Sequence, residues 1–376
     1  MAESASKERL YSLDLLRGLD IFFLTVVCGI AWAAHEGLGL FPAPPGTPEG
    51  YFGPVMEQFA HRWGVFHFID IVMPMFIFMC GAAVPFALGR RLRDGRPTAA
   101  LWMHLGERFA LLWFCGLIAQ GNLLTLDPSR IRIFDNTLQA IACGYVIAAL
   151  ALLIRRRWIR WLVPVALALA YAIPLAVCGD YTPTGNLAHR LDVMILENVA
   201  APLGLSDKIG ECTWFATVPM FGVMTIMGVI STEILTAKEA SDQRKAAQLA
   251  AFGTGVLALG WALTPVIPSV KQIYTLSFTA QAMGWCMLSL ALLYYVTDVL
   301  KLRRGMGLFI LFGQFALVAY MLADTPLAAI TSKAAETFTQ GFERWVGKGW
   351  AVFLSSVVQG VLVTFALVVR RQMKRR

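Results

Sequence analysis

Charged residues are scarce in this sequence, and their scarcity is the first guide to its class. Only 15% of the 376 residues are Asp, Glu, Lys or Arg, whereas an ordinary soluble domain carries about a quarter. Several uninterrupted apolar runs exceed the ~18 residues that cross a bilayer as a helix. These runs lack the short alternating pattern of a membrane β-barrel. We therefore predict an all-α, polytopic transmembrane helical bundle.

Motifs for metal, phosphate-loop and nucleophile chemistry are also missing. The seven cysteines are scattered singly without a CxxC pair, and the five histidines lack the HxxxH or HExxH spacing of zinc ligands. Walker A and GxSxG motifs are absent from the sequence. We therefore expect no metal site and no disulfide framework.

We predict about ten spans in a single domain that covers residues 1–376. The net charge of +8 fits a bias of basic residues toward the cytoplasm better than a nucleic-acid surface. With a cytoplasmic N-terminus, 22 of the 32 Lys and Arg residues fall in inside segments and nine outside. Both termini are then cytoplasmic, and the long outer loops are 36–66, 179–212 and 325–347. The predicted spans are 17–35, 67–89, 102–123, 135–154, 158–178, 213–234, 247–267, 273–299, 305–324 and 348–369.

Ionisable side chains inside the spans are costly in a bilayer and are functional hypotheses by default. Asp14, Arg17 and Asp20 follow one another at intervals of three in the first span. They form either a salt-bridge ladder or part of a cytoplasmic ligand site. Arg108, in the third span, either snorkels to the inner face or holds a phosphate.

Polar side chains also stand at the outer ends of spans. Asn136 and Gln139, three residues apart, either join helices or bind sugar hydroxyls. Lys271 precedes the eighth span, as an anchor or a substrate contact. His67 and Asp70 are three apart at the start of the second span, where such a pair is either an interfacial anchor or a general base.

Four stretches are distinctive: RLYSLDLLRGLDIFFL (9–24), HRWGVFHFIDIVMPMFIFMCGAAVPFAL (61–88), RIRIFDNTLQAIACGYVIAAL (130–150) and TPTGNLAHRLD (182–192). Together they resemble motifs of the heparan-α-glucosaminide N-acetyltransferase family, a group of transmembrane acyltransferases with many bacterial members. Residues 267–278 and 311–320 are similar more weakly. The resemblance implies that acetyl-CoA binds from the cytoplasmic side and that an acetyl group reaches a glucosamine amine on the far side.

His61 stands at the position of the family's catalytic histidine. Only one residue separates it from Trp63, where the family usually has two, so His67 is a second candidate. Asparagines of the family's first and ninth spans are replaced here by Cys28 and Phe315.

Our hypothesis from the sequence is an acetyl-CoA-dependent N-acetyltransferase of a bacterial inner membrane, with its active site open to the outer side. The candidate catalytic residues are His61, His67 and Asp70; the candidate substrate-binding residues are Asn136, Gln139, Trp63, Asn186 and Lys271; the candidate cofactor-binding residues are Asp14, Arg17 and Arg108. The RRLRDGR loop (90–96) adds positive charge at the inner side. Transfer through an acyl-histidine and direct transfer both remain open.

The expected co-substrate is acetyl-CoA, without a metal. The expected partners are the lipid bilayer and an amino-sugar or glycan acceptor, with no nucleic acid; a homodimer is compatible with the sequence. An amino-sugar permease is the first alternative, because His–Asp pairs also relay protons. A non-catalytic scaffold of glycan synthesis is the second, on the replacements at Cys28 and Phe315.

Overall fold

The computed structural model describes residues 10–89, 99–121, 123, 126–323 and 325–374, and every regular element within these ranges is helical. By length and composition, seven helical segments could cross a membrane: Tyr11–Leu38, Phe68–Leu88, Arg157–Cys178, Val218–Leu235, Asp242–Leu263, Leu276–Val299 and Lys348–Met373. The chain is therefore a helical membrane protein, as its composition predicts.

Each of the ten predicted spans coincides with a helix or a run of helices. The longer elements are α1 (Tyr11–Phe22), which continues through η1 (Phe23–Val27) into α2 (Cys28–Leu38), α3 (Val72–Leu88), α4 (Ala99–Ala119), α5 (Thr137–Leu152), α6 (Arg157–Cys178), α8 (Val218–Leu235), α9 (Asp242–Leu263), α10 (Leu276–Tyr294) and α15 (Lys348–Met373). The shorter ones are η2 (Met56–Phe59), η3 (Phe68–Ile71), η5 (Pro128–Arg130), α7 (Leu187–Ile195), η6 (Leu196–Ala200), η7 (Ala201–Leu203), η8 (Tyr295–Val299), α11 (Gly307–Gln314), α12 (Ala316–Ala323), α13 (Ala328–Thr339), η9 (Gln340–Phe342) and α14 (Glu343–Val346).

Three predicted spans have no match among the seven long apolar segments. Helix α4 has 21 residues but carries Glu107 and Arg108, and α5 has only 16 residues. The ninth predicted span is divided into α11 and α12, because Phe315 leaves the helical region (φ −121°, ψ 31°). The segment 325–347, predicted as an outer loop, contains two short helices, α13 and α14.

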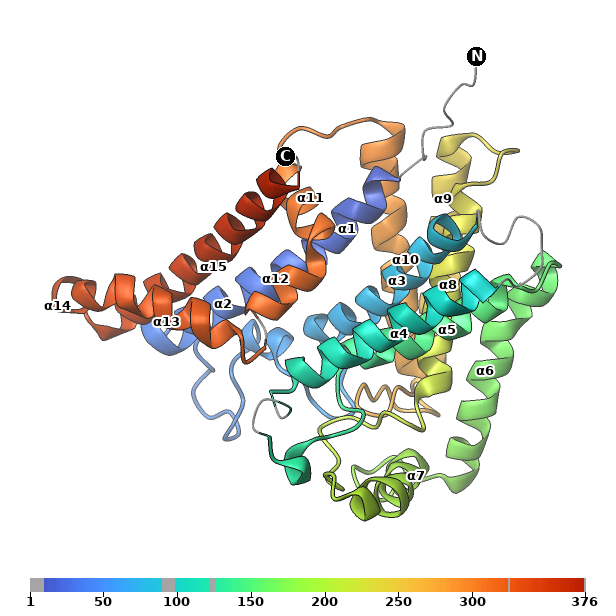
Figure 1. The fold of residues 1–376 in the computed structure, drawn as a ribbon, viewed down its shortest axis with the longest axis horizontal. Helices are drawn as coiled ribbons and strands as arrows, with labels where there is room; N and C mark the ends of the chain where they lie inside the picture. Colours follow the sequence, from blue (N-terminus) through green and yellow to red (C-terminus); the bar gives the residue numbers. More distant parts are fainter. Residues whose placement is uncertain (1–9, 90–98, 122, 124–125, 324, 375–376) are drawn as a thin grey trace.

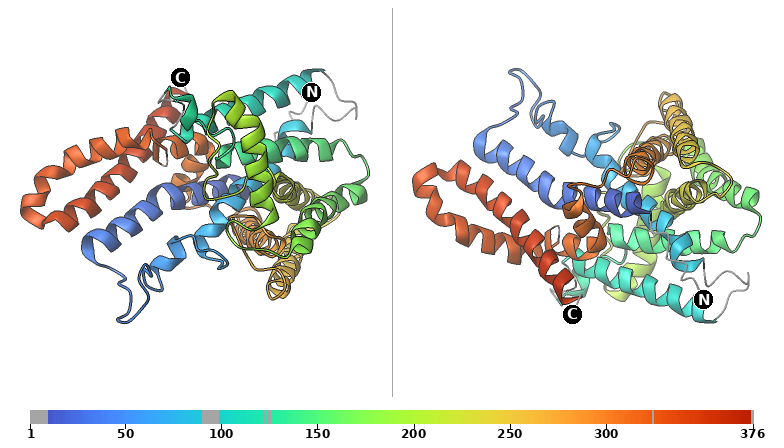
Figure 2. Two further views of the ribbon diagram at one scale, coloured as in Figure 1. Left: turned by 90° about the horizontal axis from the view of Figure 1, so that it is seen from below. Right: turned by 90° about the horizontal axis from the view of Figure 1, so that it is seen from above.

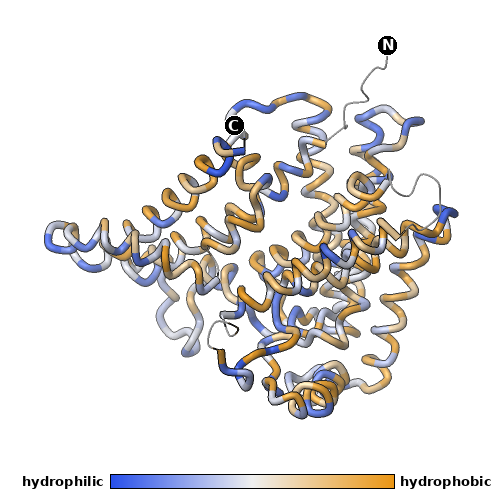
Figure 3. Tube along the Cα trace, in the orientation of Figure 1, coloured by the Kyte–Doolittle hydropathy of each residue, from blue (hydrophilic) through white to orange (hydrophobic). Residues whose placement is uncertain are grey.

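The helices form a large cluster and a smaller one (Figures 1 and 2). Buried residues of α3, α5, α8 and α10 make up most of the larger core, whereas the smaller core joins α1, α11, α12 and α15. Helix α1 begins and α15 ends at the upper side of Figure 1, while α7 and the loop after α2 lie at the lower side. Figure 3 shows that apolar residues run along the long helices and that polar residues gather in the connections.

Helices α3 and α8 contact each other through their backbones. A Cβ atom on Gly81 would lie 1.9 Å from the carbonyl oxygen of Thr225, and one on Gly228 would lie 2.0 Å from that of Phe78. Thr232 Oγ1 donates a hydrogen bond of 2.7 Å to the Ala82 carbonyl across the same contact. Small residues permit this close approach in membrane helices. The contact fixes α3, and with it the polar residues at the start of α3.

Gly81→Ala should therefore lower the free energy of unfolding by about 1–3 kcal/mol, because its methyl group collides with backbone that cannot rotate away. Thermal unfolding of the purified protein measures this. Gly106→Ala on α4 is the matched control, since a Cβ atom there meets nothing within 4 Å. Equal melting temperatures for Gly81→Ala and wild type would contradict the close contact.

Candidate functional site

An imidazole, a carboxylate and an ammonium group meet near the start of α3. His61 Nδ1 lies 2.6 Å from Asp70 Oδ1. Lys271 Nζ lies 2.9 Å from both ring nitrogens of His61 and 3.5 Å from Asp70 Oδ1. The Asp70 side chain is buried, while the side chains of Lys271 and His61 are 9% and 37% exposed. The three groups, from two distant parts of the sequence, are called the His61 cluster below.

Asp70 is fixed by the turn η3, which leads into α3. Its Oδ2 accepts a hydrogen bond of 2.9 Å from the backbone N–H of His67, so only Oδ1 faces His61 and Lys271. The ring of His67 is buried, with Nδ1 2.8 Å from the Ala60 carbonyl oxygen. The predicted pairing of the His67 and Asp70 side chains is therefore wrong: the carboxylate reaches back to the backbone of His67, and the loop brings the ring of His61 to it instead.

Two anchors hold the loop around His61. Arg62 donates hydrogen bonds to Glu57 of 2.9 Å from Nε and 2.7 Å from Nη2, and Trp63 Nε1 donates one of 2.9 Å to the Tyr181 carbonyl. The hydrogen bonds from Arg62 hold the pKa of Glu57 below its ordinary value. His61 is thus held between two tied neighbours while its own ring stays partly open.

Lys271 lies in a constrained turn between α9 and α10. Tyr274 closes the turn with a positive φ of 46°, which is uncommon for a bulky side chain. Thr213 N–H donates to the Gln272 carbonyl at 2.9 Å, and the Tyr274 hydroxyl lies 2.7 Å from Met73 Sδ on α3. These contacts aim Lys271 at the start of α3.

The hydrogen bonds of the His61 cluster indicate which ring nitrogen of His61 carries the proton. If Nδ1–H donates to the Asp70 carboxylate, Nε2 is left as an acceptor, and Lys271 can donate to it. This tautomer is assigned from the hydrogen bonds. An imidazole oriented by a carboxylate, with its second nitrogen as an acceptor, suits general-base chemistry.

Two adjoining cavities extend from the His61 cluster. The first, of about 170 Å³, is lined by residues that include His61 and Lys271. The second, of about 410 Å³, is lined by residues that include Arg17 and Arg108 and is called the arginine cavity below. Three residues line both cavities: Phe76, Thr137 and Tyr320. Helix α3 follows both cavities from Val72 to Ala83, about 16 Å at 1.5 Å per residue. The cavities therefore place two arginines at one end and the His61 cluster at the other.

The two arginines come from different helices. Arg17 of α1 lies 3.8 Å from Asp14, and the guanidinium of Arg108 on α4 lies 4.5 Å above the ring of Tyr145. Asp14 does not line the cavity. The predicted ladder stops at Asp14 and Arg17, because Asp20 lines a separate cavity.

The side-chain amides that were predicted to bind substrate mainly form hydrogen bonds to backbone groups near helix ends. Asn136 caps α5 through Leu138 N–H and places Nδ2 3.4 Å from the Tyr320 hydroxyl. Gln139 is buried; its Nε2 donates to the Ile133 carbonyl, and its Oε1 accepts from the Asp135 N–H and from Gln120. Asn186 caps α7, and its Nδ2 donates to the Thr182 and Pro183 carbonyls. Their polar atoms are thus engaged within the protein.

The remaining predicted positions lie around the site. Trp63 lines an open hollow with residues 178–183. Cys28 is half-buried on α2, and Phe315 marks the break beside which Gly313, Gln314 and Ala316 line the arginine cavity. The RRLRDGR loop (90–96) lies outside the described residues.

Sequence reasoning missed Tyr320, Thr137 and Phe76, the residues shared by the two cavities. Tyr320 ends the weakly similar stretch LFGQFALVAY, and Thr137 directly follows Asn136. That stretch and the amide pair were the available signals, but single hydroxyl and aromatic residues in apolar spans are too common to stand out.

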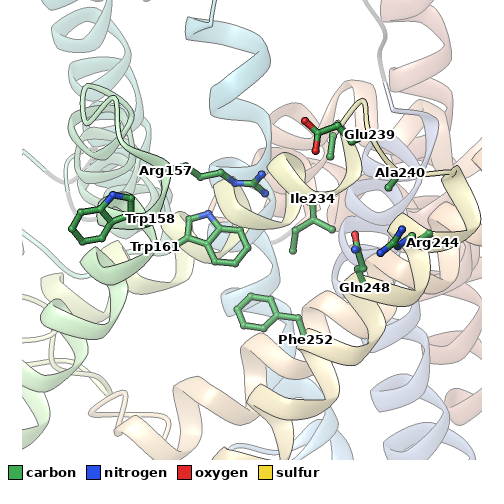
Figure 4. A pocket seen from close by; sticks show the side chains of 10 residues that line it. Arg157, Trp158, Trp161, Ile234, Glu239, Ala240, Arg244, Gln248 and Phe252 are labelled. Atoms are coloured by element: carbon green, nitrogen blue, oxygen red, sulfur yellow. The ribbon is translucent and has the colours of Figure 1, made fainter.

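A larger cavity, of about 890 Å³, lies between the starts of α6 and α9 (Figure 4). Trp161 and Phe252 stack there with ring centroids 5.9 Å apart. Among the described residues, its lining includes Arg157, Glu239 and Arg244 but neither histidine nor lysine, and it shares no residue with the two cavities at α3. The His61 cluster is therefore the stronger candidate functional site.

The Glu57–Arg62 pair should stabilise the protein only above acidic pH. Since the pKa of Glu57 is lowered in the folded protein, its contribution is present above the ordinary carboxyl value and is lost as the pH falls through the lowered value. Glu57→Gln should cost about 1 kcal/mol or less of unfolding free energy at pH 7. The difference should begin to shrink near the ordinary Glu pKa of about 4.3 and should vanish only below the lowered pKa of Glu57 in the folded protein. Chemical unfolding at several pH values measures it, with the exposed Glu336→Gln as control; a pH-independent difference would contradict the assignment.

Comparison with known proteins gives one family match. The family model described as a domain of unknown function (DUF5009) matches residues 9–181. That range contains His61, Asp70, Arg17 and Arg108 and ends before Lys271. No curated protein matches the chain.

Proposed function

We propose that the protein is a transmembrane acetyltransferase. It moves the acetyl group of cytoplasmic acetyl-CoA to the amine of a glucosamine-type sugar on the outer side of a bacterial inner membrane. The observation that carries this proposal is the pair of adjoining cavities, with Arg17 and Arg108 at one end and the His61 cluster at the other. A thioester on one side of a membrane can reach an acceptor on the other only through such a connection.

The proposed topology has ten spans with both termini in the cytoplasm. The distribution of basic residues supports this direction, and α1 begins on the same side as α15 ends (Figure 1). Arg17 and Arg108 then lie toward the cytoplasm, where the phosphates of CoA would enter. His61 lies toward the outer side, in the loop before α3.

The proposed chemistry uses His61 as the base. The amine nitrogen attacks the thioester carbonyl carbon, so a C–N bond forms and the C–S bond breaks. His61 Nε2 takes the proton of the amine and returns it to the CoA sulfur, while Asp70 orients the ring. The Lys271 ammonium, 2.9 Å from the ring nitrogens, is placed to stabilise the oxyanion.

Trp63 supports an amino-sugar acceptor. It adjoins His61 in sequence, and it lines the open hollow together with Tyr181 and Asp180. Aromatic rings offer an apolar surface to a sugar, and a carboxylate can accept hydrogen bonds from its hydroxyl or ammonium groups. The pKa of Asp180 is held below its ordinary value by hydrogen bonds from Thr182, which keeps this carboxylate charged at neutral pH.

His61→Ala should lower the rate of acetyl transfer by about 10²–10⁴-fold, the usual contribution of a general base. His67→Ala is the matched control and should retain a rate near wild type, because His67 is not among the residues that line either cavity at α3. Transfer of labelled acetyl from acetyl-CoA to glucosamine in membranes measures both. Full activity in His61→Ala would overturn the assignment of the base.

CoA should raise the melting temperature of the purified protein. Saturation at about 100 times the dissociation constant adds about 2.7 kcal/mol of stability. Arg17→Gln and Arg108→Gln should reduce this shift at a fixed CoA concentration, whereas Arg244→Gln, in the separate larger cavity, should leave it unchanged. Stabilisation by glucosamine alone, without any effect of CoA, would favour an amino-sugar permease instead.

A further inference from the structure

A separate cavity lies between α1, the start of α3 and α10. Its volume is about 570 Å³, and its walls include Leu16, Phe23, Met75, Trp285 and Leu292. We call it the Asp20 cavity after its one acidic residue. It shares no lining residue with the arginine cavity and only Val72 with the cavity of the His61 cluster. The Asp20 cavity is therefore separate from the proposed active site.

Asp20 is a carboxyl group in an apolar place. Among the described residues, it is the only ionisable one in the lining of the cavity. The residue is only 6% exposed, and within the described ranges its Oδ2 has no hydrogen-bond partner. Arg17, three residues earlier, lines the arginine cavity and pairs with Asp14. Among the described residues that line the Asp20 cavity, Asp20 therefore has no basic partner.

The Asp20 cavity opens toward lipid. Phe68 and Leu292 at its edge are 53% and 63% exposed, and both belong to segments long enough to cross a membrane. Asp20 itself lies in the first such segment, Tyr11–Leu38. A ligand would therefore enter from the bilayer.

We propose that the Asp20 cavity binds a membrane amphiphile that carries a protonated amine. Its apolar chain would fill the space between the Leu, Met and aromatic side chains, and its ammonium group would pair with Asp20. A carboxylate buried among apolar side chains is costly unless it meets an opposite charge. Ser289 in the lining offers a second acceptor, and the rings of Phe23 and Trp285 favour a cation. This site is independent of the proposed acetyl transfer.

A photoreactive long-chain alkylamine tests the proposal on the full chain in lipid nanodiscs. Mass spectrometry should locate its crosslinks on α1, α3 or α10, and an unlabelled amine should compete while the alcohol of equal chain length should not. Asp20→Asn should reduce the labelling by about tenfold, the contribution of a hydrogen bond to a charged group. Glu36→Gln, an exposed acid further along the same helical run, should label like wild type.

A second variant keeps the test decisive if Asp20→Asn does not yield folded protein. Ser289→Phe fills the cavity while Asp20 remains, and it should also abolish the labelling. Undiminished labelling of either folded variant, or equal competition by the alcohol and the amine, would overturn the proposal and leave only a nonspecific lipid groove.

Discussion

The buried carboxylate of Asp70 is the constraint on which the site depends. A carboxylate removed from water needs partners, and Asp70 obtains three of them from two segments: the backbone N–H of His67, the ring of His61 and the ammonium of Lys271. Each partner satisfies the acid and is oriented by it. The loop before α3 and the turn before α10 are therefore joined at one point, although about 200 residues separate them in the sequence.

Helix α3 connects the His61 cluster to the rest of the bundle. The turn η3 directly before it holds Asp70, its first turns line both adjoining cavities, and its middle contacts Gly228 of α8 through Gly81. Because glycine lets the two backbones touch, α3 has little freedom to shift. A rigid wall along the cavities would let a long flexible acyl carrier be positioned by shape, with charged residues needed only at its ends.

The sequence pointed to the right residue types more often than to the right pairs. Spacing by three suggested that His67 pairs with Asp70 and that Asp14, Arg17 and Asp20 form a ladder. In each case one member has another environment in the fold: the Asp70 carboxylate accepts a hydrogen bond from the backbone of His67, and Asp20 lines a separate cavity. Local spacing describes which side chains can meet on one helix, but it does not include the loop that brings His61 or the turn that brings Lys271.

The sequence by itself determined the helical membrane class, the approximate positions of the helices and the presence of Arg17, Arg108, His61 and Lys271 as candidates. These follow from local hydropathy and from the cost of polar groups in a bilayer. Only the tertiary structure decided that His61 and not His67 meets Asp70, that Lys271 joins them, that Gln139 and Asn186 are used to hold backbone, and that Asp20 lines a separate cavity. The physical reason is that a buried polar group takes its partners from whichever segments packing brings near, and sequence distance does not encode that proximity.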